Sequence, residues 1–303
     1  MAGPVVLAGG TGGAKLARGM LDVVGAELTV IANTADDIEI YGAYVSPDPD
    51  LVTFWLADRI DERGWGLRDD TFAVMDGLRE IGVDVWFALG DRDLAIGIER
   101  ARRLAEGARL TEALAELGSA LGVAARVLPM TDEPVRTWVQ VGTRWVAFQE
   151  FMIRGDAASA IRDTQLRGVD SALPTVEVLE AIAAASAIVI GPSNPVISIG
   201  PILGVPRLRE ALLDSPAPIV AVSPIVGGEV LKGPTAAFMR WAGYDASTAS
   251  IAACYDGLLD GLVADEPVDA GVPVLRTDTL MTDADSRRRV ARETLRFAEG
   301  LAA

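Results

Sequence analysis

The chain of 303 residues contains no histidine and a single cysteine, Cys254. Without histidine, a Ser-His-Asp triad, a histidine general base and the usual catalytic zinc sites are excluded. With one cysteine, an intramolecular disulfide and a cysteine-based metal cluster are excluded as well. Acid–base chemistry therefore falls to Asp, Glu, Lys or Tyr. Any metal site would be lined by oxygen, which favours Mg²⁺.

Positive charge and long apolar runs are also scarce. The chain has 27 basic against 43 acidic residues, a net charge of −16. This balance predicts no nucleic-acid partner and no anionic membrane partner. No apolar run approaches the roughly 20 residues of a membrane span, and the first residues lack a signal-peptide pattern, so a cytoplasmic location is expected. A phosphorylated ligand would need local help from backbone N–H groups, helix N-termini or a bridging cation.

Apolar segments without strict alternation are interspersed with helical patterns, which predicts an α/β fold with a Rossmann-like, mostly parallel sheet flanked by helices. Strands are predicted at residues 5–8, 28–32, 85–88, 126–129, 137–140, 145–149, 187–190, 219–222 and 274–276. Helices are predicted at residues 14–24, 50–57, 69–81, 110–121, 157–162, 176–185, 207–214, 236–243, 247–258 and 286–301. Consecutive strands within residues 126–154 predict a small antiparallel or helical insertion in a single domain spanning residues 1–303.

Two segments that follow predicted strands are rich in small residues. Residues 191–203 combine prolines, glycines, serines and Asn194, which predicts a rigid, ligand-facing loop. Residues 9–13 are Gly9, Gly10, Thr11, Gly12 and Gly13, a turn that would open a helix and let the backbone approach a phosphate. The alternative is a turn that serves packing alone. The turn is not a P-loop, because Lys15 is not followed by Ser or Thr at the right spacing, and it is not a strict G-x-G-x-x-G.

Aspartates gather in three further segments. Asp48 and Asp50 alternate with prolines and are candidates for Mg²⁺ ligands or a positioned base, although Asp50 could instead cap a helix. Asn33 and Asp36 follow the second strand, either to contact a ligand or to form a cap or Asx-turn. Trp65 and the loop before residue 71 could pack or stack on a planar ligand, with Asp69 or Asp70 capping the next helix.

Residues 89–93 follow the predicted strand 85–88. There Asp91 and Asp93 flank Arg92, and the trio could orient the arginine toward a phosphate, serve as metal ligand or base, or form a structural ion pair. Residues 223–228, with Lys232 shortly after, and residues 277–281 leave the last strands as further small-residue loops. Because the carboxyl ends of parallel strands share one edge of a sheet, these segments together indicate one cleft.

Six segments occur in this order: residues 9–16, 46–48, 89–95, 191–203, 223–225 with 232–234, and 277–281. Together they resemble the CofD family, the 2-phospho-L-lactate transferases, called FbiA in actinobacteria, over nearly the whole chain. The resemblance implies Mg²⁺-dependent transfer of a phospholactyl, phosphoenolpyruvyl or phosphoglyceryl group from a guanosine-diphosphate-linked donor to the deazaflavin Fo. GMP would leave, the product would be a precursor of coenzyme F-420, and a homodimer is expected.

By this resemblance, the ribityl hydroxyl of Fo attacks the donor phosphate, and catalysis is mostly positioning and charge neutralisation. Asp48 or Asp50 would meet that hydroxyl or the metal, and the segment of Asp91, Arg92 and Asp93 would lie near Fo and the reacting phosphate. The glycine turn would line the cleft floor. The guanosine or its phosphates would be held by Ser193, Asn194 and Ser198.

The chain departs from the family pattern at two places. Ile96 and Gly97 stand where members usually carry Thr-His, and Ala147 stands where a histidine is common. Both departures bear on the acceptor pocket or the donor side chain rather than on phosphoryl transfer. Two alternatives remain at this point: a regulatory protein that binds nucleotide sugars without catalysis, and a nicotinamide-dependent oxidoreductase, which would require a stricter glycine fingerprint.

Overall fold

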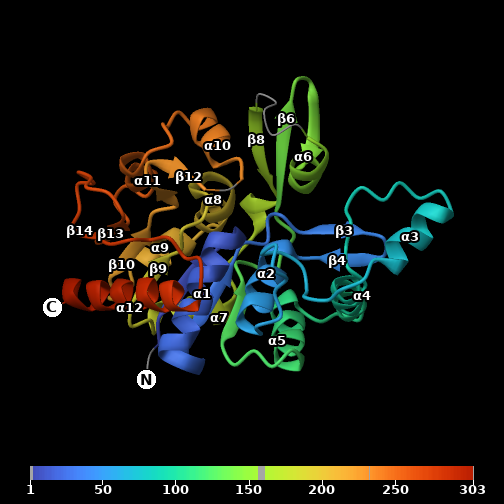
Figure 1. Ribbon diagram of the computed structural model, residues 1–303, viewed down its shortest axis with the longest axis horizontal. Helices are drawn as coiled ribbons and strands as arrows, with labels where there is room; N and C mark the ends of the chain where they lie inside the picture. The colour runs from blue at the N-terminus through green and yellow to red at the C-terminus, as the bar shows by residue number, and fades with distance from the viewer. Residues whose placement is uncertain (1–2, 156–160, 232, 303) are drawn as a thin grey trace.

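The computed structural model describes residues 3–155, 161–231 and 233–302. Its main sheet has seven parallel strands in the order β14-β13-β10-β9-β1-β2-β5 (Figure 1). These strands are β1 (Val5–Ala8), β2 (Thr29–Ala32), β5 (Arg126–Pro129), β9 (Ile188–Ile190), β10 (Ile219–Val222), β13 (Gly261–Ala264) and β14 (Val274–Arg276). The predicted fold class is confirmed, although β13 was not predicted.

Helices cover both faces of this sheet. One face packs on α1 (Gly10–Val24), α2 (Pro47–Leu56) and α12 (Ala284–Leu301), and the other on α7 (Val176–Ala183), α8 (Gly200–Gly204), α9 (Leu208–Leu213) and α11 (Thr248–Cys254). Successive strand residues point to opposite faces, so Val6 and Ala8 join the first core and Val5 and Leu7 the second. Burial on both faces explains why these strands are continuous apolar runs.

The strand order reverses beside β1. The chain passes from β1 to β2 and β5 on one side, then returns to β9 on the other side and continues to β10, β13 and β14. Such a reversal opens a crevice at the carboxyl ends of the two adjoining strands, β1 and β9. The glycine turn at residues 9–13 leaves β1, and the loop at residues 191–203 leaves β9. The two segments singled out from the sequence therefore meet at the switch point of the sheet.

A lobe extends to the right of the sheet in Figure 1 and holds the hairpin β3 (Ile38–Ile40) and β4 (Ala43–Val45) with α3 (Ala73–Glu80) and α4 (Asp91–Ala105). The predicted strand 85–88 is wrong. These residues pack against the hairpin as irregular chain, and the N–H groups of Trp86 and Phe87 donate to the Tyr41 hydroxyl at 3.0 and 3.2 Å. A side chain thus replaces the neighbouring strand as hydrogen-bond partner.

A three-stranded antiparallel sheet rises at the top of Figure 1, formed by β6 (Arg136–Val141), β7 (Arg144–Ala147) and β8 (Ile161–Arg167) beside α6 (Phe148–Arg154). The insertion therefore starts and ends later in the sequence than predicted, because residues 126–129 belong to the main sheet and β8 extends to Arg167. The predicted strand 145–149 ends at Ala147, since Phe148 and Phe151 pack at helical spacing on Phe238. The predicted helix 157–162 is wrong at residues 161–162, which begin β8; residues 157–160 lie outside the described part of the chain.

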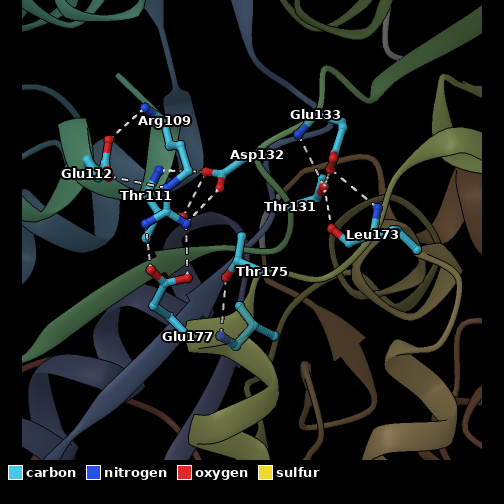
Figure 2. Close-up of polar contacts among 10 residues, drawn as sticks. Arg109, Thr111, Glu112, Thr131, Asp132, Glu133, Leu173, Thr175 and Glu177 are labelled. Carbon is cyan, nitrogen blue, oxygen red and sulfur yellow. Dashed lines mark hydrogen bonds and ion pairs between the residues drawn. The ribbon is translucent and has the colours of Figure 1, made fainter. Parts of the chain in front are cut away.

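An arginine network ties this insertion to the main sheet (Figure 2). Arg109 precedes α5 (Leu110–Ala120) and pairs with Glu177 of α7 at 2.7 Å and with Asp132 of the β5–β6 connection at 3.4 Å. Asp132 also accepts hydrogen bonds from the backbone and hydroxyl of Thr111 at 2.7 and 2.8 Å. The network fixes where the chain leaves β5 for the insertion.

The remaining elements are short: the 3-10 turns Gly25–Glu27 and Val169–Ser171, the π-helical turn Pro195–Ile199, the hairpin β11 (Ile225–Val226) and β12 (Glu229–Val230), and α10 (Thr235–Trp241). The boundaries of the other predicted helices agree with the structure within a few residues, whereas α4, α6 and α8 were not predicted. In the described part of the chain, no helix is both long enough and apolar enough to cross a bilayer.

Candidate active site

The glycine turn is the first turn of α1, which begins at Gly10 rather than at the predicted Ala14. Gly10 has a φ of +63°, a conformation that favours glycine. The first N–H groups of a helix have no partner within the helix, and their positive end attracts anions. Here Gly9 donates to Ser193 Oγ at 3.3 Å and Gly10 donates to Asp48 Oδ1 at 2.6 Å. The turn is thereby bound to the β9 loop on one side and to α2 on the other.

The glycines allow an approach too close for any side chain. A Cβ on Gly12 would lie 2.0 Å from the Pro192 carbonyl oxygen, and one on Gly13 would lie 2.7 Å from Ser193 Oγ. A Cβ on Gly9 would meet Ser198 at 2.6 Å. The predicted donor-binding serines and the glycine turn therefore form one tightly packed edge.

Gly12→Ala is expected to lower the free energy of unfolding by about 1–3 kcal/mol, because the added methyl group forces α1 away from the Pro192 backbone. Urea unfolding measures this. Gly77→Ala is the matched control: it also lies inside a helix, α3, with nothing within 4 Å of its Cβ, and should be neutral or slightly stabilising. Equal effects from both variants would contradict the close approach.

Asp48 occupies the junction between the glycine turn and α2. Pro47 opens α2, so the predicted Pro-Asp-Pro-Asp loop is in fact the first helical turn, where acidic side chains favour the helix dipole. Asp48 is 6% exposed, and its Oδ2 accepts from Asn33 Nδ2 at 2.9 Å. Burial raises the pKa of Asp48. Burial, followed by repulsion from Asp48 and Asp37, raises the pKa of Asp36 further.

Asp50 has a different environment from Asp48. Both of its carboxylate oxygens are held by Arg100 of α4, a fully buried guanidinium that also donates to the Tyr44 carbonyl at 2.9 Å. The two predicted metal ligands therefore differ in their electrostatic environment, since Arg100 already neutralises the charge of Asp50. Sequence reasoning missed Arg100. The signal was its spacing of seven from Asp93, which puts both on one face of a helix.

A cleft of about 220 Å³ opens beside Asp48. Its wall combines aromatic rings with carboxylates, a lining suited to a planar ligand with a polar tail. The main contributors are Asp48, Asp50, Phe54, Arg63, Trp65, Asp70, Phe72, Phe87, Asp93 and Gln149. Asp93 is half-buried there, and burial, followed by repulsion from Asp50, raises its pKa to about 7.

Asp91 and Arg92 are placed differently from Asp93. The Asp91 carboxylate accepts from the Thr71 hydroxyl at 2.6 Å and from the N–H groups of Ala73 and Val74, so it caps the start of α3. These bonds lower the pKa of Asp91. Arg92 has an exposed side chain. Neither residue lines the cleft.

The expected cap of α3 by Asp69 or Asp70 is wrong. Asp70 instead accepts from the N–H groups of Arg92 and Asp93 at 2.9 and 3.1 Å, at the start of α4. Asp70, which precedes α3 in the sequence, therefore caps α4, and Asp91, the first residue of α4, caps α3. A Cβ on Gly90 would lie 2.1 Å from Asp70, which explains the glycine there.

The remaining predicted residues lie around the switch point. Lys15 Nζ donates to the Met281 carbonyl at 3.0 Å, which brings residues 277–281 to α1. Thr11 lies next to Gly64 of the Trp65 loop. Asn194 Oδ1 accepts from Val196 N at 2.9 Å, while its buried Nδ2 has no hydrogen-bond partner among the described residues. Lys232 lies outside the described residues.

The two departures from the family pattern lie at α4 and at the start of α6. Gly97 of α4 packs on the β3–β4 hairpin, where a Cβ would lie 3.1 Å from Ala43 and 3.2 Å from the Tyr44 carbonyl oxygen. A histidine at residue 97 would therefore require the hairpin to move. Ala147 precedes α6, two residues before Gln149 of the cleft wall.

The raised carboxyl pKa values predict an unusual pH dependence. Burial raises the pKa of Asp37 and of Asp93 from 3.8 to about 7, so between pH 4 and pH 7 the folded state binds protons that the unfolded chain has released. Proton binding by these two carboxyl groups stabilises the folded state relative to the unfolded chain, and this stabilisation is lost as pH rises toward 7. The free energy of unfolding should fall from pH 5 to pH 7.5, and less so in Asp37→Asn. A steady rise over that range in urea titrations would contradict the assigned burial.

This geometry defines an α/β protein with a glycine-rich turn at the switch point of its sheet and an aromatic, acidic cleft beside it. A family model described as 2-phospho-L-lactate transferase CofD matches residues 5–290. The chain is 41% identical to the phosphoenolpyruvate transferase of Kitasatospora aureofaciens, over 97% of each chain. It is 38% identical to the 2-phospho-L-lactate transferase of Methanosarcina mazei, over 95% of this chain and 97% of the other.

The chain therefore belongs to the CofD family and is an enzyme of the 2-phospho-L-lactate transferase type. The crystal structure of a UPF0052 family protein from Bacillus halodurans superposes with a TM-score of 0.62 at 18% identity, covering 97% of this chain and 99% of that one. At this identity the likeness supports the fold alone. Family membership favours the transferase over the nicotinamide-dependent oxidoreductase considered from the sequence.

Proposed function

We propose that the enzyme transfers a phospholactyl, phosphoenolpyruvyl or phosphoglyceryl group from a guanosine-diphosphate-linked donor to the ribityl hydroxyl of the deazaflavin Fo, in the biosynthesis of coenzyme F-420. One observation carries the proposal: Asp48 both lines the aromatic cleft and binds the glycine turn at the switch point. A two-substrate transfer needs such a meeting point, with a phosphate site on one side and a pocket for a planar acceptor on the other.

The donor would lie at the switch point. The first-turn N–H groups of α1 suit its phosphates, and Ser193, Ser198 and the unpartnered Nδ2 of Asn194 offer further polar contacts beside them. These groups supply binding where the net charge of −16 would otherwise repel a diphosphate. The hydroxyl oxygen of Fo would form the new bond to the phosphorus that carries the three-carbon acid, and GMP would leave with the bridging oxygen.

Asp93 is our candidate for the group that accepts the hydroxyl proton. It lines the cleft with Asp48, and its pKa of about 7 matches that of an effective general base at neutral pH. Asp50 is less suited because Arg100 holds both of its oxygens. In this assignment Asp91 supports α3 and Arg92 takes no part in the chemistry.

Asp48 and Asp36 fit a Mg²⁺ ion. Both are desolvated, they repel each other, and Asp36 Oδ1 is buried without a partner, so a cation beside them would relieve an excess of negative charge. Among the described residues, no three acidic side chains already form a metal site. Mg²⁺ commonly uses one or two carboxylates and completes its shell with substrate phosphate and water. When bound, it would neutralise charge on the transferred phosphate.

Two binding measurements test the proposal. Fo fluorescence titrated with the protein should report saturable binding, and Mg²⁺ with GDP should raise the melting temperature of the wild type but much less that of Asp48→Asn. Tight binding of a nucleotide sugar with no binding of Fo would favour the regulatory alternative and contradict the transferase.

A further inference from the structure

One aromatic side chain in the cleft wall is largely exposed. Phe54 of α2 is 2% exposed within the core, and Phe72 and Phe87 pack against the core of the β3–β4 lobe. Trp65 also lines the cleft, yet 53% of it is exposed. A tryptophan left open in a cleft contributes little to the core and offers a broad apolar surface to a ligand.

The loop that carries Trp65 holds the ring in place without burying it. Gly64 and Gly66 flank it with φ values of +86° and +71°, which other residues rarely adopt. The loop is closed by hydrogen bonds from Gly64 N to Asp61 O at 2.9 Å and from Asp61 N to Gly66 O at 3.1 Å. Its backbone is therefore fixed by contacts within the loop itself.

Arg63 covers one face of the Trp65 ring. Its guanidinium carbon lies 4.3 Å from the ring centroid, and Asp61 Oδ1 accepts from both the Nε and the backbone N–H of Arg63 at 2.5 and 3.0 Å. A cation stacked on an indole is attracted by the ring electrons and restrains its rotation. Since the guanidinium occupies one face, a flat ligand can stack on Trp65 only through the opposite face.

We propose that this free surface of Trp65 is the stacking platform for the tricyclic ring of the acceptor, with Arg63 as the positioning residue behind it. The inference rests on the proposed function and assigns the ring of Fo rather than the guanine of the donor. Trp65 shares the cleft wall with Asp48 and Asp93, whereas the glycine turn, Ser193 and Ser198 lie outside that wall. A ring on Trp65 leaves its ribityl chain to reach the carboxylates.

The test measures Fo affinity by fluorescence in the wild type, Trp65→Ala, Trp65→Phe and Trp145→Ala. Trp145 is the matched control: a half-buried indole beside Arg167 at 5.7 Å, on β7 and outside the cleft wall. Loss of a stacking ring should raise the Kd for Fo by about tenfold to a hundredfold in Trp65→Ala. Trp65→Phe should recover much of the affinity, and Trp145→Ala should match the wild type. The KM for Fo should rise with little change in kcat, and GDP affinity should not change.

The outcomes separate this inference from the function on which it rests. Wild-type binding of Fo with unchanged affinity in Trp65→Ala overturns the platform and leaves the transferase intact. Equal losses of Fo and GDP affinity, or a large fall in melting temperature, would show a structural role for Trp65 and overturn the platform too. Failure of the wild type to bind Fo overturns both proposals.

Discussion

Arg100→Leu is expected to lower the free energy of unfolding by about 3–5 kcal/mol. The guanidinium of Arg100 is 1% exposed and is bound to both oxygens of Asp50. Removing it leaves the Asp50 carboxylate buried without its partner and takes a neighbouring cation away from Asp37 and Asp93. The remaining charges repel one another in a medium of low dielectric. Guanidinium chloride unfolding at pH 7.5 measures the loss.

Two further variants show whether this loss arises from the buried ion pair. Arg102→Leu lies on the same helix, but Arg102 is exposed and its partners are the surface residues Glu99 and Glu106, so a change below about 1 kcal/mol is expected. Replacing Asp50 by Leu together with Arg100 should recover much of the lost stability, because no unpaired charge remains. A double variant as unstable as Arg100→Leu would point to lost packing instead.

Asp48→Asn is expected to lower kcat by about a hundredfold or more while the protein stays folded. The amide of the variant keeps an oxygen that can accept from the Gly10 N–H, but it places an NH₂ group opposite the NH₂ group of Asn33. It also lacks the negative charge with which Asp48 would attract a cation. Asp132→Asn is the control, since Asp132 also accepts a backbone N–H, that of Thr111, but lies outside the cleft wall. Turnover at the wild-type rate in Asp48→Asn would remove Asp48 from the site.

Local signals in the sequence were sufficient to predict a mostly parallel sheet and the two loops that the structure brings to its switch point. Strands buried on both faces are continuous apolar runs, and glycine, proline and small polar residues follow them where the chain turns toward a ligand. The loops after β1 and β9 were therefore identified without tertiary information. Strand β13 was missed because it begins with Gly261, a weak strand former, which is needed where a Cβ would lie 2.6 Å from the Phe297 ring.

The assignment of individual aspartates depends on contacts that span the sequence. Asp91 and Asp70 exchange caps across 21 residues of chain, and Asp50 meets Arg100 across 50, so neither pairing has a local pattern. The segment before Asp91 resembles a strand in composition, but its N–H groups bind the Tyr41 hydroxyl. The sequence therefore identified the aspartate-rich segments, whereas the contacts that place Asp50 in an ion pair and Asp70 and Asp91 in helix caps required the structure.

The central claim is that the aromatic cleft and the glycine turn bring an acceptor and a phosphorylated donor together at Asp48. The most direct test supplies purified protein with Fo, Mg²⁺ and, in turn, the lactyl, enolpyruvyl and glyceryl guanosine-diphosphate donors, and follows the products by mass. We expect Fo to gain the mass of one phospho-acid as GMP appears in equal amount, with a preferred donor among the three. Fo that remains unmodified with every donor, in a folded protein that binds GDP, would contradict the account.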